Sequence, residues 1–163
     1  MSSMLITIIL WAAAIGSGLM AGIYFTFSVF VMRAFNKIDA PHAVTAMNAI
    51  NQTILNSLFM PLFFVTSIIS LFLIIFSFSH WNESGSHFIF YAGTIYLIGM
   101  FFCTIIFNVP LNNSLAELNL DKANVNMAWS HYYKHWTNWN HLRTMSSLIT
   151  SLLCIWVLSH EAS

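Results

Sequence analysis

The chain has 163 residues, of which 58% are hydrophobic and only 6% are charged, and its formal net charge at pH 7 is zero. Soluble domains usually carry about 25% charged residues, so the composition excludes an ordinary soluble fold and predicts an integral membrane protein. No excess of basic residues is available to bind nucleic acid, and we expect no nucleic-acid partner.

Four apolar segments are long enough to cross a membrane as helices. They cover approximately residues 5–32, 58–78, 88–107 and 143–158, and the last is lengthened by the Trp-rich block that precedes it. Four spans use most of the chain, so we predict an all-α fold with one domain over residues 1–163, an integral membrane four-helix bundle.

The basic residues all lie in, or at the edges of, the connections after the first and third segments. They are Arg33, Lys37, Lys122, Lys134 and Arg143. Cytoplasmic connections carry the excess of Lys and Arg in membrane proteins. We therefore expect the first and third connections to be cytoplasmic and both termini to lie outside.

Small residues recur every four positions in the first segment, at Ala14, Gly18, Gly22 and Thr26. Such a ridge allows another helix to approach closely. Packing inside the bundle is the simplest interpretation. A homodimer through the Gly18/Gly22 face and a cavity wall are the alternatives.

Prolines mark two points on the second segment. Asp39 and Pro41 predict a helix that begins near residue 40, with Asp39 as N-cap and Pro41 in the first turn. Pro61 predicts a bend farther along the same helix, because it removes one backbone hydrogen bond.

Amide side chains follow one face of this helix before it becomes apolar. Asn48, Gln52 and Asn56 are spaced four residues apart, and Asn51 lies beside them. Buried amides need hydrogen-bond partners. The amide side chains therefore predict one of three arrangements: a hydrogen-bonded contact between helices, a solvated extension of the helix outside the membrane, or the wall of a polar cavity.

The third segment ends in Asn108-Val-Pro-Leu-Asn112. Asn108 and Asn112 share a face if the helix continues, whereas Pro110 predicts a kink or an end near this point.

A block rich in aromatic and polar residues, from Trp129 to Thr144, precedes the fourth apolar segment. In a helix, one stripe of this block contains Trp129, Tyr132 or Tyr133, Trp136, Trp139 or Asn140, and Arg143. An aromatic belt at the membrane surface explains the aromatic residues. Arg143 must reach the membrane surface, find a partner or line water, and we consider that it bridges the asparagines of the second and third segments.

Histidines in the same block define a further alternative. His131 and His135 lie four residues apart and form half of a metal site, which needs a third or fourth ligand. A haem site is less favoured, because no predicted span carries a histidine near its middle. We predict no cofactor and keep a metal or haem site as the alternative.

Two motifs together resemble the anthrone oxygenase-like membrane family. They are Asn108-Val-Pro-Leu-Asn112 and the later Trp136-Thr-Asn-Trp-Asn-His-Leu-Arg143. Gly22-Ile-Tyr-Phe-Thr-Phe-Ser28 is similar to the N-terminal helix of that family, and the resemblance covers nearly the whole chain. It implies a four-helix membrane protein, here in a bacterial inner membrane. Fungal relatives oxidise anthrones to anthraquinones with molecular oxygen and without a conventional cofactor.

This chemistry requires a base, hydrogen-bond donors for an enolate oxygen, and a dry apolar pocket. His141 is the candidate base, since imidazole titrates near neutral pH. Asn140 is a candidate donor and Arg143 a fixed positive charge, which makes these three the candidate catalytic residues. The candidate substrate-binding residues are Asn108, Asn112, Trp136, Trp139, Asn48, Asn51 and Tyr24.

A hydrophobic aromatic small molecule and membrane lipid are the expected partners. The same residues are also compatible with a membrane protein that binds a lipid, a quinone or a partner subunit without catalysis, because an Arg–Asn–Trp cluster suits an anionic or carbonyl-bearing group.

Overall fold

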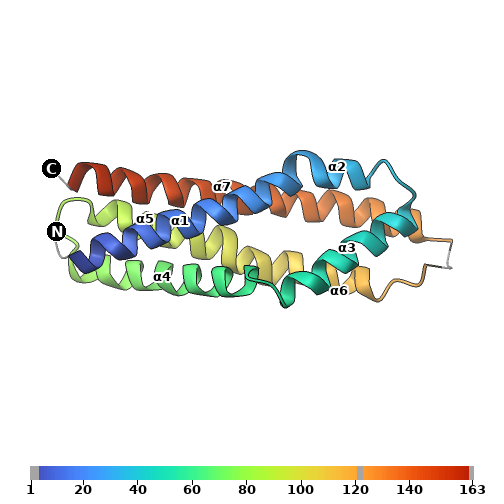
Figure 1. The fold of residues 1–163 in the computed structure, drawn as a ribbon, viewed down its shortest axis with the longest axis horizontal. Helices are drawn as coiled ribbons and strands as arrows, with labels where there is room; N and C mark the ends of the chain where they lie inside the picture. The colour runs from blue at the N-terminus through green and yellow to red at the C-terminus, as the bar shows by residue number, and fades with distance from the viewer. Residues whose placement is uncertain (1–3, 121–122, 162–163) are drawn as a thin grey trace.

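The computed structural model describes residues 4–120 and 123–161, and these residues form a bundle of long helices (Figure 1). Four of the helices are long and apolar enough to cross a membrane, which confirms the predicted all-α membrane bundle. They cover Met4–Phe35, Phe59–Ser79, Ser86–Ala116 and Val125–His160. The fourth combines the predicted apolar segment with the Trp-rich block that precedes it in one uninterrupted helix.

Several of the long helices are composite. The elements in chain order are α1 (Met4–Thr26), η1 (Phe27–Val31), α2 (Met32–Phe35), α3 (Ala40–Leu55), α4 (Phe59–Ser79), α5 (Ser86–Tyr96), η2 (Leu97–Phe102), η3 (Thr104–Asn108), α6 (Val109–Ala116) and α7 (Val125–Glu161), where η denotes a π-helical segment. The π-helical segments widen the first and third long helices without ending them.

The two ends of the bundle differ in what they contain. One end, here called the terminal end, carries both described chain ends and the α4–α5 connection, whereas the basic end carries the α2–α3 and α6–α7 connections (Figure 1). Arg33 and Lys37 lie at or beyond α2, and Lys134 lies on the half of α7 nearer the basic end. Lys122 lies outside the described residues.

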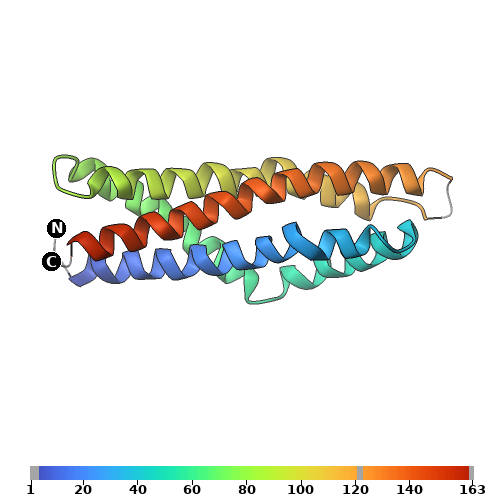
Figure 2. The ribbon, with the colours of Figure 1, turned by 90° about the horizontal axis from the view of Figure 1, so that it is seen from above.

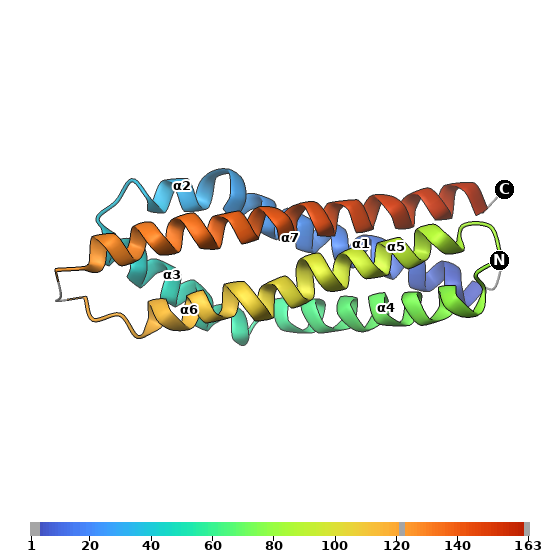
Figure 3. The ribbon, with the colours of Figure 1, turned by 180° about the vertical axis from the view of Figure 1, so that it is seen from behind.

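Helix α7 is the central packing element. At the terminal end it packs against both α1 and α5 (Figure 2), and α4 packs against α5 and α1. Toward the basic end it packs with α3 and α6 instead (Figure 3).

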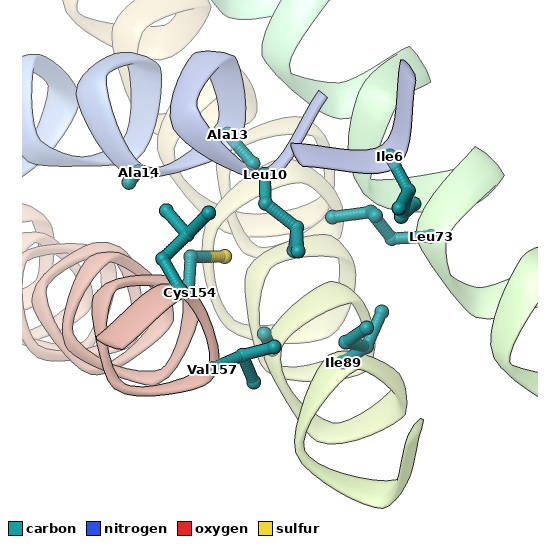
Figure 4. Close-up of a cluster of buried hydrophobic side chains, with 10 residues drawn as sticks. Ile6, Leu10, Ala13, Ala14, Leu73, Ile89, Cys154 and Val157 are labelled. Atoms are coloured by element: carbon teal, nitrogen blue, oxygen red, sulfur yellow. The ribbon is translucent and has the colours of Figure 1, made fainter. Parts of the chain in front are cut away.

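The apolar core at the terminal end brings together side chains from all four long helices (Figure 4). Leu10 of α1, Leu73 of α4, Ile89 of α5 and Val157 of α7 are each 3% exposed or less. Burial of large aliphatic side chains at this level explains why these four segments pack as one unit.

The small-residue ridge of α1 packs against α7 along part of its length. Ser151 donates a hydrogen bond to the carbonyl oxygen of Ala14 at 2.8 Å, and a Cβ at Gly18 would lie 3.2 Å from Ser151 Oγ. Gly22 is exposed and has open space beside it. Packing inside the bundle therefore accounts for Gly18, and the homodimer through the Gly18/Gly22 face stays a prediction.

The second long helix is broken rather than bent. Helix α3 ends at Leu55 and α4 begins at Phe59, and Pro61 lies in the first turn of α4. The predicted bend at Pro61 is corrected to a three-residue break, because a proline in the first helical turn costs no hydrogen bond. Helix α3 begins after Asp39 as predicted, although the Asp39 side chain makes no capping hydrogen bond.

The third long helix continues through Pro110. Helix α6 extends to Ala116, and the π-helical segment η3 ends at Asn108, immediately before the turn that contains the proline. A wider turn is a common way to accommodate a proline inside a helix. Asn108 and Asn112 therefore lie on one continuous helix.

Candidate functional site

A cavity of about 230 Å³ lies between the long helices at the level of the α3–α4 break. Most of its lining is apolar, from α3, α4 and η3. Its polar lining residues are Tyr24, Asn51, Thr104, Asn112, Trp136 and Arg143. They come from α1, α3, η3, α6 and α7, so the cavity depends on the packing of the whole bundle.

Arg143 provides the positive charge of the cavity. Its side chain is 4% exposed. Its Nη2 donates to Asn140 Oδ1 at 2.7 Å, and its Nη1 donates to Thr104 Oγ1 at 3.5 Å. The asparagines of the second and third long helices make other contacts, so the hypothesis that Arg143 bridges them is wrong.

Two aromatic rings surround the Arg143 guanidinium. Its Cζ atom lies 4.2 Å from the ring centroid of Tyr24 and 5.0 Å from that of Trp136. A cation over an aromatic face gains about 2 kcal/mol or more when the pair is desolvated. These rings therefore compensate part of the cost of burying the charge.

None of the carboxylates in the described part of the chain pairs with Arg143. Asp39, Glu83 and Glu117 are exposed and lie in connections or at helix ends. Asp39 lies instead 3.9 Å from His42, measured from Oδ2 to Nδ1. The guanidinium is thus a buried cation without a carboxylate, which is a costly arrangement.

Asn140 fixes the orientation of the Arg143 side chain. Its Nδ2 donates to the carbonyl oxygen of Tyr24 and to Ser28 Oγ, both at 2.7 Å. Because both amide hydrogens are used, the Oδ1 atom is left to accept the bond from Arg143. Asn140 is completely buried, so this arrangement joins α1 and η1 to α7 where water does not compete.

Three buried donors of the cavity-lining residues lack a hydrogen-bond partner among the described atoms. They are Asn51 Nδ2, Trp136 Nε1 and Arg143 Nε. Buried polar atoms in proteins are nearly always hydrogen-bonded, and an unpaired donor costs about 1–3 kcal/mol. The side chains that carry these donors line the cavity, although the three donor atoms themselves are buried and do not face its open space.

Asn112 connects the cavity to the aromatic stripe of α7. The Tyr132 hydroxyl donates to Asn112 Oδ1 at 2.8 Å, and Tyr132 is 3% exposed. Among the predicted substrate-binding residues, the cavity thus brings together Tyr24, Asn51, Asn112 and Trp136.

Three other predicted substrate-binding residues lie outside this lining. Asn108 is buried behind it and donates to the Trp136 carbonyl oxygen at 3.3 Å. Asn48 donates to the Leu115 carbonyl oxygen at 3.3 Å. Trp139 stacks on Phe107, with ring centroids 3.7 Å apart.

His141 does not share the cavity with Arg143. It is exposed and lines a separate pocket between η1–α2 and α7. Residues two apart in a helix differ by about 200° in direction, so His141 and Arg143 point to different sides of α7. The structure brings together Arg143 and Asn140 of the candidate catalytic residues, but not His141.

His131 and His135 lie on the exposed side of α7, with ring centroids 4.3 Å apart. Over the described ranges, no group of three or more metal-binding side chains forms, so this pair has no third protein ligand there.

Sequence reasoning did not select Thr104 or Ser28, which contact Arg143 and Asn140. Thr104 precedes Asn108 by four residues on the same helix, and this spacing was a usable signal. The π-helical segments η1 and η3, which contain Ser28 and Thr104, lie at the level of the site, as π-helical turns often do.

Comparison with known proteins identifies the family. The family model described as anthrone oxygenase matches residues 52–153, which is more than half of the chain. The chain belongs to the anthrone oxygenase family. No curated protein and no solved structure matches it. The matched region contains Thr104, Asn112, Trp136 and Arg143, whereas Tyr24 comes from outside it.

Proposed function

We propose that this member of the anthrone oxygenase family binds a weakly acidic aromatic ketone or phenol of the anthrone type in the Arg143 cavity and oxidises it with molecular oxygen. The observation that supports this most is the buried guanidinium, which has no carboxylate partner among the described residues. A buried, unpaired charge is strongly stabilised by an anion of complementary shape.

The apolar lining favours an aromatic ligand. The cavity volume of about 230 Å³ exceeds the roughly 150 Å³ cavity that holds a benzene ring in an engineered protein. Phe59, Phe63 and Trp136 offer ring faces or edges to a planar molecule. A fused-ring compound therefore fits the lining better than a polar metabolite does.

The polar end of the cavity suits a single oxygen anion. The unpartnered donors of Arg143, Trp136 and Asn51 come from two helices, α7 and α3. Fixed donors that face a developing oxyanion stabilise it without reorganisation during the reaction. We assign this role to the Arg143 guanidinium, which Asn140 holds in position, and we propose that Trp136 and Asn51 turn their free donors toward the anion when it binds.

The reaction then follows from the anion. The positive charge favours loss of a proton from the bound ketone to water, which leaves its enolate. The enolate carbon donates electrons to O₂ and forms a carbon–oxygen bond, and the peroxide anion that results takes a proton back from water. The hydroperoxide then loses water to become a carbonyl. One oxygen atom enters the quinone and the other leaves as water. His141 has no part in this scheme, because it lines a different pocket.

The rim of the cavity is apolar and exposed, which allows a ligand to enter from the membrane. Leu55, Phe64, Ile105 and Val109 line it and are at least 41% exposed. Helix α4 has 21 residues, about 30 Å, which matches the hydrocarbon core. We infer that α4 crosses the core, that the cavity mouth lies at its border near Phe59, and that the basic end is cytoplasmic.

Oxygen consumption tests the proposal. The purified protein in lipid nanodiscs is supplied with anthrone, and O₂ uptake and quinone absorbance are measured against a heat-denatured sample that reports spontaneous oxidation. We expect catalysed uptake of one O₂ per quinone, and we expect Arg143→Met to lose it while remaining folded. Binding of an anthrone without any catalysed uptake would instead identify a non-enzymatic binding protein. Failure of the wild-type protein to bind would reject the assignment of the cavity.

A further inference from the structure

We propose that a second pocket, between the η1–α2 region and α7, binds the phosphate group of an anionic membrane lipid. This pocket has a volume of about 230 Å³ and is separate from the Arg143 cavity. Its lining includes Ser28, Arg33, Lys134, Thr137, Asn138 and His141. The proposal does not depend on the chemistry proposed for the Arg143 cavity.

Positive charge converges on this pocket from two helices. Arg33 lies on α2, whereas Lys134 and His141 lie on α7, and all three side chains are exposed. Among the described residues that line the pocket, none is acidic. Two permanent cations on facing helices, with a histidine and an exposed amide beside them, form a binding set for phosphate oxygens.

The pocket extends from the lipid headgroup layer into the water beside it. If α4 crosses the hydrocarbon core, its first turn and Arg143 mark the border of the core. Residues 134–141 lie two to nine positions farther toward the basic end of α7, which is about 3–14 Å along its axis. The headgroup layer begins at the same border and adds about 5–7 Å to each side of the roughly 30 Å core. His141 therefore lies within this layer, whereas Lys134 lies beyond it and reaches back toward a phosphate through its long, flexible side chain.

Exposed apolar residues continue the pocket toward the membrane. Val29 precedes Arg33 by one helical turn, and Met145 follows His141 by one turn on α7. These side chains are 39% and 53% exposed. Both lie on the membrane side of the basic residues, where acyl chains attached to a bound phosphate would pass. A free phosphate ion would gain nothing from them, so this arrangement favours a lipid.

Lipid binding to the detergent-solubilised protein provides the test, measured by native mass spectrometry with phosphatidylglycerol and phosphatidylcholine. We expect a preference for phosphatidylglycerol. One basic residue near a membrane contributes about a fivefold change in lipid affinity, so Arg33→Ala and Lys134→Ala should each weaken phosphatidylglycerol binding about fivefold and the double variant about thirtyfold. All of these side chains are exposed, and size-exclusion chromatography verifies that the variants remain folded.

Lys37→Ala is the matched control, because Lys37 is exposed near the same end but does not line the pocket. We expect the affinity of this variant for phosphatidylglycerol to change less than twofold, because Lys37 lies outside the pocket. An equal loss for Lys37→Ala, or equal binding of the two lipids, would overturn the proposal in favour of diffuse charge attraction. Displacement of the lipid by an equal concentration of inorganic phosphate would overturn it in favour of a free-phosphate site.

Discussion

The Arg143 guanidinium lies over the aromatic ring of Tyr24, with its Cζ atom 4.2 Å from the ring centroid. The buried cation is therefore held by ring faces and by the Asn140 amide oxygen instead of a carboxylate. These partners are neutral, so the cavity keeps a net positive charge within an apolar lining. An anion that enters it gains an electrostatic interaction that water does not screen.

Asn140→Asp should remove the affinity of the cavity for anions. The new carboxylate would lie where Oδ1 now accepts a 2.7 Å bond from Arg143, and it would neutralise the guanidinium. We expect the affinity for a hydroxyanthraquinone anion to fall by at least about tenfold, equivalent to about 1.4 kcal/mol. Quenching of tryptophan fluorescence in the folded variant measures the effect.

The control for this variant is Asn126→Asp, which adds the same charge at an exposed position near the start of α7. It should bind the ligand as the wild-type protein does. Unchanged binding by Asn140→Asp would show that Arg143 is not the partner of the anion.

Tyr132→Phe should destabilise the half of the bundle nearer the basic end. The substitution removes the 2.8 Å hydrogen bond to Asn112 and leaves a half-buried amide oxygen without that donor. A loss of about 0.5–1.5 kcal/mol in the free energy of unfolding is expected. Unfolding in sodium dodecyl sulfate measures it, with Tyr91→Phe as control, because Tyr91 is 51% exposed. Equal effects of the two variants would contradict a specific role for this bond.

Two glycine positions should respond in opposite directions to alanine. A Cβ at Gly93 would lie 2.5 Å from the carbonyl oxygen of Ser70, whereas one at Gly22 would meet nothing within 4 Å. Gly93→Ala must separate α4 and α5 and should cost about 1–3 kcal/mol. Gly22→Ala should increase stability by up to about 1 kcal/mol, because alanine favours the helix. Thermal melting in detergent compares the two, and a destabilised Gly22→Ala would indicate that another chain packs on this face.

The aromatic stripe of α7 was predictable because it depends on one helix alone. The spacing of Trp129, Tyr132, Trp136, Asn140 and Arg143 places them on one face, and the structure buries all five side chains to 5% exposure or less. The helical geometry also separates His141 from Arg143, so the different location of His141 could have been derived from the sequence.

The rest of the site could not be predicted, because it depends on how separate helices pack. Tyr24, Thr104 and Arg143 are distant in the chain and meet only when the first, third and fourth long helices reach the same level. The π-helical segments have no recognised sequence signal here. The three-residue break before α4 opens the space for the cavity, whereas Pro61 alone predicted only a bend.

A bulky residue at the mouth of the cavity should slow the passage of ligands without changing the polar end. Ile105 lines the cavity and is 45% exposed, whereas the next residue, Ile106, is 56% exposed and does not line it. Ile105→Trp should lower both the association and the dissociation rate of an aromatic ligand by about three- to tenfold, with a smaller change in Kd, because the obstruction affects the path more than the bound state. Stopped-flow fluorescence in nanodiscs measures both rates. Ile106→Trp adds the same side chain to the lipid-facing surface and should leave them unchanged, so equal slowing in both variants would place the entry route elsewhere.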